Sequence, residues 1–395
     1  MTAAGIIAEY NPFHNGHAYM LSKVKTEISD AAVIAMSTSF VQRGEPAVLS
    51  TQARVKAALA NSADLVVALP VPWAMSGAQN FATGGVSVLN SLGVVHKLAF
   101  GSECADIELL KKVGECVNGG ETVELLRKYL SEGLSFAAAR QKAVEQICPE
   151  AVGVLGNPND ILAVEYMNAV KSLGVNLTPL CIKRQGVGHD CAAEGSSASA
   201  SAVRALMRTA GDISGFVPEE TVSIIETEKK CGRVPATLSN IERAVLYKLR
   251  MSSAQEIALA PDVSEGIENR IAFAAQEACS LDEVYAMAKT KRYTHARIRR
   301  IVMSTFLGIT AKDAEGVPPY IRVLGFSNNG KMLLRQANGA CGLPVVMKYS
   351  DVKKLDDKAK RIFELECRAA DIHSLCFPVP AACASVQKFT PVILK

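Results

Sequence analysis

The chain has 395 residues, of which 49% are hydrophobic, enough for two or three domains with real cores. Its formal net charge is only +4, so the overall charge does not by itself indicate a nucleic-acid partner. No run of about 18 uncharged apolar residues occurs, and no basic segment precedes an apolar stretch at the start, so we expect neither a membrane span nor a signal peptide. Eleven cysteines without a Cys-x-x-Cys pair indicate buried, reduced thiols in a cytoplasmic protein.

The first half of the chain alternates apolar runs with helical patterns. The runs are bounded by turn residues, so we expect them to be strands. They lie at residues 5–8, 31–36, 65–69, 97–100 and 177–182. Helical patterns lie at residues 51–61, 78–92, 107–117, 121–146 and 163–172. This alternation predicts an α/β fold with a Rossmann-like parallel sheet, in which ligands bind at the carboxyl ends of the strands.

The stretch from Gly5 to His17 ends the first expected strand in a polar turn and begins a helix. His14 and His17 are three residues apart, so they can share one face of that helix. Gly16 between them has no side chain and lets a ligand approach the backbone closely. The helix start adds free N–H groups and the positive end of the helix dipole. Together these features predict a phosphate site, and the alternative is a pair of histidines that face solvent or the core.

A polar loop follows the second expected strand, at residues 37–45. Arg43 in this loop can neutralise phosphate charge with its planar fork of donors, and an exposed arginine on a surface loop is the alternative. Two isolated acids, Asp64 and Glu103, have the chemistry to hold magnesium. Such acids are usually solvated surface groups, and we assign a metal to neither.

The turn at residues 156–162 precedes another helical pattern. Either Asn159 or Asp160 is expected to cap that helix. The other side chain is then free to reach a ribose or a base edge.

Cations follow the fifth expected strand, where Lys183, Arg184 and Gln185 precede a glycine. Two cations at a strand end suit a triphosphate. A further helix opens at residue 199, and its hydroxyl Ser201 and Arg204 one turn later form a clamp for β- and γ-phosphates. The alternative for this second pair is a helix cap and a surface arginine.

From about residue 211 the strand patterns fade, and amphipathic helices dominate, as at residues 241–249 and 268–279. Residues 284–312 contain no Asp or Glu. Six cations cluster within this stretch, namely Lys289, Lys291, Arg292, Arg297, Arg299 and Arg300. Cations without acids are a footprint for a phosphate backbone, and Tyr293 among them has a ring that could stack on a base, worth roughly 1–3 kcal/mol. An ordinary basic helical face is the alternative.

The last part of the chain shows strand patterns again, at residues 321–326 and 343–348. We therefore expect three parts. The first, 1–210, is an α/β part that carries the phosphate site. The second, 211–312, is a largely helical, basic part suited to RNA. The third, 313–395, is a small α+β region.

Several motifs are more specific than their single residues. They are Gly5–His17, Phe40–Pro46, Phe100–Glu103, Pro158–Leu162, Ile182–Arg184, Glu265–Arg270 and Lys289–Thr294. The first contains His-x-Gly-His after a first strand, the signature of nucleotidyltransferases whose two histidines contact the triphosphate. With these motifs the chain resembles the bacterial tRNA(Met) cytidine acetate ligase family of that HxGH superfamily.

The resemblance implies an ATP-dependent ligase that modifies RNA. Such an enzyme activates acetate as acetyl-adenylate, releases pyrophosphate, and transfers the acetyl group to N4 of the wobble cytidine of elongator tRNA(Met), giving N4-acetylcytidine. It implies ATP and acetate as substrates, Mg²⁺ accompanying ATP, and tRNA as the macromolecular partner. It implies neither a membrane nor a protein partner.

Candidate site residues follow from the strand-end pattern and the resemblance together. The catalytic candidates, which would neutralise charge on the leaving pyrophosphate, are His14, His17, Lys183 and Arg184. The residues expected to bind ATP are Ile7, Ala8, Glu9, Tyr10, Asn11, Pro12, Phe13, His14, Asn15, Gly16, His17, Gly101, Asn159, Arg184, Gln185, Ser201 and Arg204. The residues expected to bind RNA are Lys289, Lys291, Arg292, Tyr293, Arg297 and Arg300.

The chain departs from the family pattern in two places. Thr38-Ser39 stands where a Gly-Asn-like pair is common, and Asp160 stands where a second Asn is common, so acyl or nucleotide contacts could differ. Two other hypotheses stay open. One is a small-metabolite adenylyltransferase, which shares the first motif but needs no basic helical part. The other is a non-catalytic tRNA-binding protein with a regulatory nucleotide site.

Overall fold

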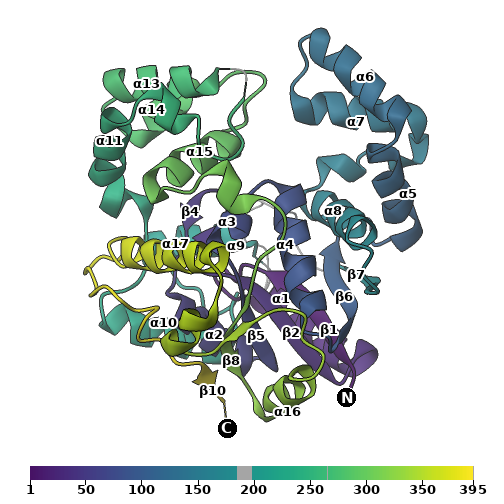
Figure 1. Cartoon of the computed structure of the whole chain (residues 1–395), viewed down its shortest axis with the longest axis vertical. Coiled ribbons are helices and arrows are strands. Elements are labelled where there is room, and N and C mark those ends of the chain that lie inside the picture. The colour runs from purple at the N-terminus through teal and green to yellow at the C-terminus, as the bar shows by residue number, and fades with distance from the viewer. Residues whose placement is uncertain (185–197, 265, 395) are drawn as a thin grey trace.

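The computed structural model describes residues 1–184, 198–264 and 266–394. At its centre is an eight-stranded sheet in the order β10-β8-β5-β2-β1-β6-β7, with β9 beside β8 (Figure 1). The strands are β1 (Ala3–Ala8), β2 (Ala31–Ser37), β5 (Leu65–Leu69), β6 (Val95–Ser102), β7 (Thr178–Lys183), β8 (Ile321–Phe326), β9 (Val345–Val346) and β10 (Val392–Ile393). The five strands from the first half of the chain run parallel, which confirms the expected α/β fold.

The central strands are buried on both faces, as their apolar sequences require. All residues of β2 and β5 are buried, and successive side chains point to opposite faces of the sheet. Val33 packs into the core that contains α4 (Ala78–Ser91), whereas Ile34 packs into the core that contains α2 (Thr51–Ala60). The sheet is thus a layer between helices, and its carboxyl edge is left for loops.

The remaining helices of the first half surround this sheet. They are α1 (Asn15–Lys23), α3 (Val71–Ala74), α5 (Ile107–Val117), α6 (Gly120–Ser131), α7 (Phe136–Ile147), α8 (Pro158–Ser172) and α9 (Ala200–Arg208). Helix α8 packs on α4 and α5, while α6 and α7 lie away from the sheet at the upper right of Figure 1. A short hairpin of β3 (Phe40–Val41) and β4 (Glu45–Pro46) follows β2.

The second part of the chain is helical, as expected. Its helices are α10 (Glu219–Lys230), α11 (Glu242–Met251), α12 (Ala254–Ile257), α13 (Ile267–Glu277), α14 (Leu281–Ala288) and α15 (His295–Leu307). The labelled helices α11, α13, α14 and α15 gather at the upper left of Figure 1, whereas α10 packs on α2 of the α/β part. The helical group therefore begins structurally at α11, later than residue 211.

The C-terminal region does not form a separate α+β unit. Strand β8 pairs antiparallel with β5, with Leu65 opposite Phe326, because all six residues of β8 are buried and need apolar surface on both faces. The following helix α16 (Asn328–Ala337) starts against the sheet, where a Cβ at Gly330 would clash with the carbonyl oxygen of Asp64. Helix α17 (Asp357–His373) then packs on α3 and α15.

Three further findings concern the whole chain. In the described ranges, no helix combines the length and apolarity needed to cross a membrane. The ten cysteines that the structure describes are all free, but only Cys148, Cys367 and Cys376 are buried, so the expectation of buried thiols is wrong for the others. The strand expected at residues 343–348 is only two residues long.

Candidate functional site

A cavity of about 790 Å³ opens at the carboxyl edge of the sheet, a size typical of small-molecule sites. Its wall is built from the polar turn after β1, the β3–β4 hairpin, the ends of β6 and β7, and the starts of α8 and α9. Among the residues expected to bind ATP or to catalyse, those that line it are Ile7, Ala8, Glu9, Tyr10, Asn11, His14, Asn15, Gly16, His17, Gly101, Asn159, Lys183 and Arg184. The strand-end pattern therefore brought most candidates together.

The remaining ATP candidates are placed differently. Pro12 and Phe13 are buried beneath the turn, and neither they nor Ser201 and Arg204 are among the described lining residues. Gln185 lies outside the described residues.

The two histidines are fixed to the backbone at the start of α1. His14 is the N-cap residue, and its Nδ1 accepts a hydrogen bond from the Gly16 N–H at 3.0 Å. Nδ1 of His17 accepts from the His14 N–H at 3.2 Å, and the two rings stack 3.8 Å apart. Because each Nδ1 uses its lone pair, each neutral ring carries its proton on Nε2. Both rings can therefore donate hydrogen bonds through their Nε2–H groups.

The charge state of these rings follows from burial. Removal from water lowers the pKa of His14 to about 3, and the nearby charges of Arg184 and Arg204 act in the same direction. Burial, the neighbouring His14 and Arg184 hold the pKa of His17 well below its usual value. Without a bound anion the histidines are neutral donors at physiological pH, and the positive charge of the wall comes from Lys183 and the arginines.

Hydrogen bonds from distant segments fix the turn after β1. Oδ1 of Asn11 accepts from the Val48 N–H at 2.7 Å, and its carbonyl accepts from Nη1 of Arg204 at 2.8 Å. Tyr10 in the same turn has a φ of +47°, which is unfavourable for a bulky residue. Its ring is buried against Phe13, which compensates for that backbone cost.

Helix α9 begins with a serine cap, and its Arg204 contacts the turn after β1. Nη1 of Arg204 donates to the Asn11 carbonyl at 2.8 Å and so supports the turn, and its contact with phosphates stays a prediction. Ser199 lines the cavity and caps α9, its Oγ accepting from the Ala202 N–H at 3.2 Å. Ser201 lies 2.9 Å from Ser199, Oγ to Oγ. The cap that was the alternative is therefore present.

The cap expected for α8 is also wrong. Pro158 takes the first helical position, where its missing N–H costs nothing, and Asn157 becomes the N-cap residue. Asp160 is fully buried and accepts from Ser102 Oγ at 2.6 Å and from the Glu103 N–H at 2.9 Å. Glu103 in turn accepts from Asn159 Nδ2 at 2.5 Å. These bonds join the end of β6 to the start of α8.

The structure also shows where the two departures from the family pattern and the isolated acid Asp64 lie. Asp160 and Thr38, which depart from the family pattern, are not among the described residues that line the cavity. Asp64 bonds Lys25 Nζ at 2.6 Å and the Ala32 N–H at 2.9 Å, so its role is structural. Within the described ranges, no group of three or more His, Cys, Asp and Glu side chains is arranged to hold a metal ion.

Arg54 is an organising residue that the sequence reading missed. It lies on α2 with no exposed surface, and it donates to the carbonyl oxygens of Glu9 at 2.7 Å and Ser37 at 2.8 Å, and also to that of Thr38. The turns after β1 and β2 are thus held by one guanidinium. Burial lowers the pKa of Arg54 to about 10, so it stays charged. The available signal was a lone arginine on the apolar, alanine-rich face of a helix.

The β3–β4 hairpin connects the cavity to α15. Gln42 and Arg43 line the cavity, so the structure places Arg43 where it was expected. Glu45 bonds Nη1 of Arg299 at 2.8 Å. Gly44 has a φ of +72°, and a Cβ there would lie 2.8 Å from backbone atoms of Arg299 and its neighbour. Only glycine fits this close contact between hairpin and helix.

The structure divides the six residues expected to bind RNA. Lys289, Lys291 and Arg292 are exposed before α15, as a phosphate-binding surface requires. Tyr293 is only 4% exposed, and its hydroxyl donates to the Ser264 carbonyl at 2.5 Å. Stacking of Tyr293 on a base is therefore contradicted.

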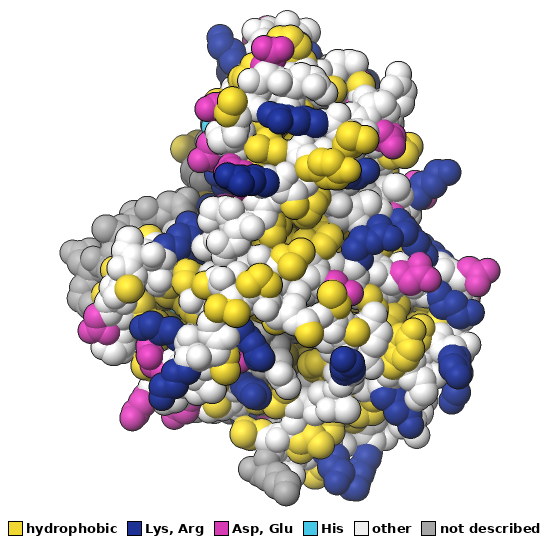
Figure 2. Space-filling view, turned by 90° about the vertical axis from the view of Figure 1, so that its left-hand side faces the viewer, with side chains coloured by type: hydrophobic (Ala, Val, Ile, Leu, Met, Phe, Trp, Pro, Cys, Tyr) yellow, Lys and Arg dark blue, Asp and Glu magenta, His cyan; other side chains and the backbone are white. Residues whose placement is uncertain are grey.

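The other two cations of this group, Arg297 and Arg300, already have protein partners. Nε of Arg297 donates to the Asp262 carbonyl at 2.9 Å, and Nε of Arg300 donates to Oδ2 of Asp262 at 2.8 Å. Arg300 also lines the main cavity. The absence of acids within residues 284–312 did not reveal these partners, because Asp262 contacts the stretch from an earlier loop. On the face in Figure 2, Lys and Arg side chains are scattered among apolar ones and form no single stripe.

Comparisons with known proteins agree with this geometry. A family model described as HIGH nucleotidyl transferase matches residues 1–388. The tRNA(Met) cytidine acetate ligases of Acetivibrio thermocellus and Caldanaerobacter subterraneus subsp. tengcongensis are each 37% identical, and each match covers 100% of both chains.

Solved structures are similar over the full length. The crystal structure of Thermotoga maritima TmcAL bound with alpha-thio ATP has a TM-score of 0.92 at 32% identity, and each chain is covered completely. The apo form of the same protein has a TM-score of 0.95 at the same identity and coverage.

Proposed function

The chain belongs to the tRNA(Met) cytidine acetate ligase family of HIGH nucleotidyl transferases, and we propose that it joins acetate to a cytidine of tRNA(Met) at the expense of ATP. The observation that carries this proposal is the pair of backbone-fixed histidines facing a cavity whose wall also holds Lys183 and Arg184. That wall suits a triphosphate, and relatives with the same full-length architecture carry this name.

In the first step, an oxygen of acetate forms a bond to the α-phosphorus of ATP, and the bond to the bridging oxygen of pyrophosphate breaks. Negative charge grows on the leaving pyrophosphate. Nε2–H donors of His14 and His17, together with Lys183 and Arg184, would stabilise this charge. Because the imidazoles are held by their Nδ1 atoms, they need no reorientation when the charge develops.

In the second step, N4 of the cytidine forms a bond to the acetyl carbon, AMP departs with the electron pair of the mixed anhydride bond, and N4 loses one proton. The product is N4-acetylcytidine. The protein's contribution is to hold the two reactants together and to limit water, which would hydrolyse the adenylate.

The nucleoside of ATP would occupy the side of the cavity formed by β6 and α8. Gly101 lies there beside Arg184, whose Cγ would be 3.3 Å from a Cβ at that glycine. Asn159, at the start of α8, lines the cavity, and its side-chain amide donates to Glu103. We propose both as nucleoside contacts.

Magnesium would come with ATP. Glu9 is the one carboxylate among the described lining residues, and its Oε1 already accepts from the Gln42 N–H at 2.8 Å. The described residues therefore offer no dedicated cation site, and the triphosphate and water would supply most ligands, as is usual for Mg²⁺.

The tRNA would approach over the segment before α15. Lys289, Lys291 and Arg292 are exposed there, and α15 runs from this segment to Arg300 on the cavity wall. A phosphate backbone at the cations would thus bring its neighbouring nucleotides toward the cavity. A protein with this substrate is expected to act in the cytoplasm.

A pyrophosphate exchange experiment tests the activation step. The chain is incubated with ATP, Mg²⁺ and labelled pyrophosphate, with and without acetate and tRNA(Met). Acetate-dependent formation of labelled ATP supports the proposal. Exchange that ignores acetate but responds to a phosphorylated metabolite would favour the small-metabolite adenylyltransferase, and no exchange under any condition would leave a binding protein.

A further inference from the structure

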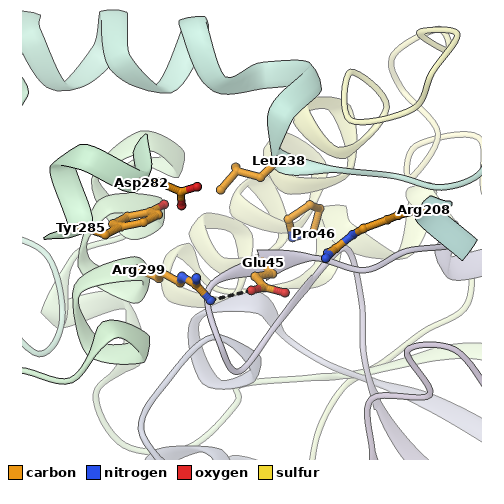
Figure 3. Close-up of a pocket in the computed structure, with 7 residues that line it drawn as sticks. All are labelled: Glu45, Pro46, Arg208, Leu238, Asp282, Tyr285 and Arg299. Carbon is orange, nitrogen blue, oxygen red and sulfur yellow. Dashed lines mark hydrogen bonds and ion pairs between the residues drawn. The ribbon is translucent and has the colours of Figure 1, made fainter. Parts of the chain in front are cut away.

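A second, smaller pocket lies where the α/β part meets the helical group. Its volume is about 150 Å³, and Figure 3 shows the side chains around it. They come from five separate segments: the β3–β4 hairpin, α9, the 3₁₀ turn before α11, helix α14 and helix α15. The lining residues are Glu45, Pro46, Arg208, Leu238, Asp282, Tyr285 and Arg299.

This pocket is distinct from the cavity proposed for ATP. The two share no described lining residue. Arg43 and Arg300 line the large cavity, whereas their chain neighbours Glu45 and Arg299 line the small pocket. Gly44, between Arg43 and Glu45 in the chain, makes a close contact with the backbone of Arg299 and Arg300. A ligand in the small pocket would therefore sit beside the reaction site without entering it.

The small pocket contains a buried polar atom that lacks a partner. Tyr285 is 3% exposed, and in the described part of the chain its hydroxyl has no hydrogen-bond partner. An unsatisfied buried hydroxyl costs roughly 1–3 kcal/mol, so it is expected to find a partner in the functional state. Burial raises the pKa of Tyr285, which keeps the hydroxyl protonated as a donor.

Other polar groups around the pocket balance one another in charge. Arg299 bonds Glu45 and lies over the Tyr285 ring, 5.5 Å from its centroid. Asp282 and Arg208 stand at the exposed side, and among the described residues neither side chain makes a hydrogen bond or an ion pair. Two arginines and two carboxylates leave little net charge, so the pocket does not favour phosphate.

The shape and chemistry fit a flat, neutral ligand with both donors and acceptors. Pro46 and Leu238 supply apolar contact, Tyr285 and Arg208 can donate, and Asp282 can accept. A cavity of about 150 Å³ accommodates a six-membered aromatic ring. Unpaired bases of RNA have these properties. Proteins commonly recognise a base that is splayed out of its stack by hydrogen bonds to the edges of the base.

We propose that this pocket binds an unpaired base of the RNA substrate, separate from the cytidine that is acetylated. The inference rests on the proposed function, because it requires RNA to lie along the helical part. It adds a subsite that would distinguish one RNA loop from another. Tyr285, Asp282 and Arg208 are the residues that would read the base.

The test uses the full chain and a fluorescent RNA hairpin with the anticodon loop of elongator tRNA(Met). Tyr285→Phe removes only the hydroxyl, and Leu238→Trp fills the pocket. Tyr247→Phe, at an exposed tyrosine on α11, is the matched control. We expect Tyr285→Phe to weaken binding about five-fold, the usual value of one hydrogen bond, with the control unchanged and acetyl-adenylate formation preserved in all three.

A series of hairpins, each with one abasic loop position, identifies the base. One abasic position should weaken binding to the wild-type chain and have no further effect in Leu238→Trp. Equal losses in both proteins at every position, or unchanged affinity of Tyr285→Phe, would overturn the inference while leaving the proposed function intact. A wild-type chain that neither binds nor acetylates this RNA would overturn both.

Discussion

The sequence predicted a binding role for both the turn after β1 and the basic segment before α15. The two regions differ in how their side chains are held. In the turn, His14 and His17 are held by backbone groups within three residues, so a local motif specifies the geometry. In the basic segment, Arg297 and Arg300 are held by Asp262, about 35 residues earlier in the chain. A motif whose bonds are local can be read from sequence, whereas a composition bias cannot reveal partners that the fold supplies.

The largest effect is expected at the histidine pair. Replacing both His14 and His17 by Ala should lower acetyl-adenylate formation by about a thousand-fold or more, since loss of a single donor to developing charge costs 10²–10³-fold. The affinity for tRNA should remain nearly unchanged. Pyrophosphate exchange and a filter-binding measurement give the two values, and His96→Ala, at an exposed histidine, is the control. Equal loss of both properties would contradict the separation of the two regions.

The next effect concerns the buried arginine that ties two turns together. Arg54→Met should lower the free energy of unfolding by about 3 kcal/mol, because buried carbonyls of Glu9, Ser37 and Thr38 lose their donor. Urea unfolding measures this change. Lys56→Met on the exposed side of the same helix should have almost no effect, and a similar loss for both variants would show that helix α2, not the guanidinium, is responsible.

Removing the charges of the basic segment tests whether it binds tRNA. Replacing Lys289, Lys291 and Arg292 by Ala should weaken tRNA binding by at least ten-fold and reduce the slope of log K against log salt by about 2, from three lost phosphate contacts. Acetyl-adenylate formation should be spared. Lys353→Ala with Lys354→Ala, at exposed sites before α17, serves as the control. An unchanged salt slope would mean that RNA binds elsewhere.

A further effect is a pH dependence of stability. The pKa of His14 is about 3 in the folded chain and near its ordinary value of about 6.5 when unfolded, so the unfolded chain binds more protons between these values. The stability contribution is complete above pH 6.5 and is lost as the pH falls toward 3, by up to about 1.4 kcal/mol per pH unit. His14→Gln should flatten urea-derived stability between pH 6.5 and 5. An identical slope in the variant would contradict the burial argument.

Particular residues show how far sequence reasoning reached. The parallel strands and the His-x-Gly-His turn were predictable, because apolar runs and turn residues are local signals. The pairing of β8 with β5 was not predictable, since the sequence of an isolated apolar strand does not indicate which edge of the sheet it joins. Arg54 was missed because a buried arginine looks like a surface residue until its carbonyl partners are known. Tyr293 was misplaced because its partner, Ser264, is distant in sequence.

The most direct test of the whole account is the product itself. The chain is incubated with ATP, Mg²⁺, labelled acetate and elongator tRNA(Met), and the RNA is digested to nucleosides for mass spectrometry. We expect N4-acetylcytidine only when all components are present, and none with the His14→Ala, His17→Ala variant. Acetate-dependent pyrophosphate release without acetylated cytidine would contradict the proposed acceptor and direct the search to another one.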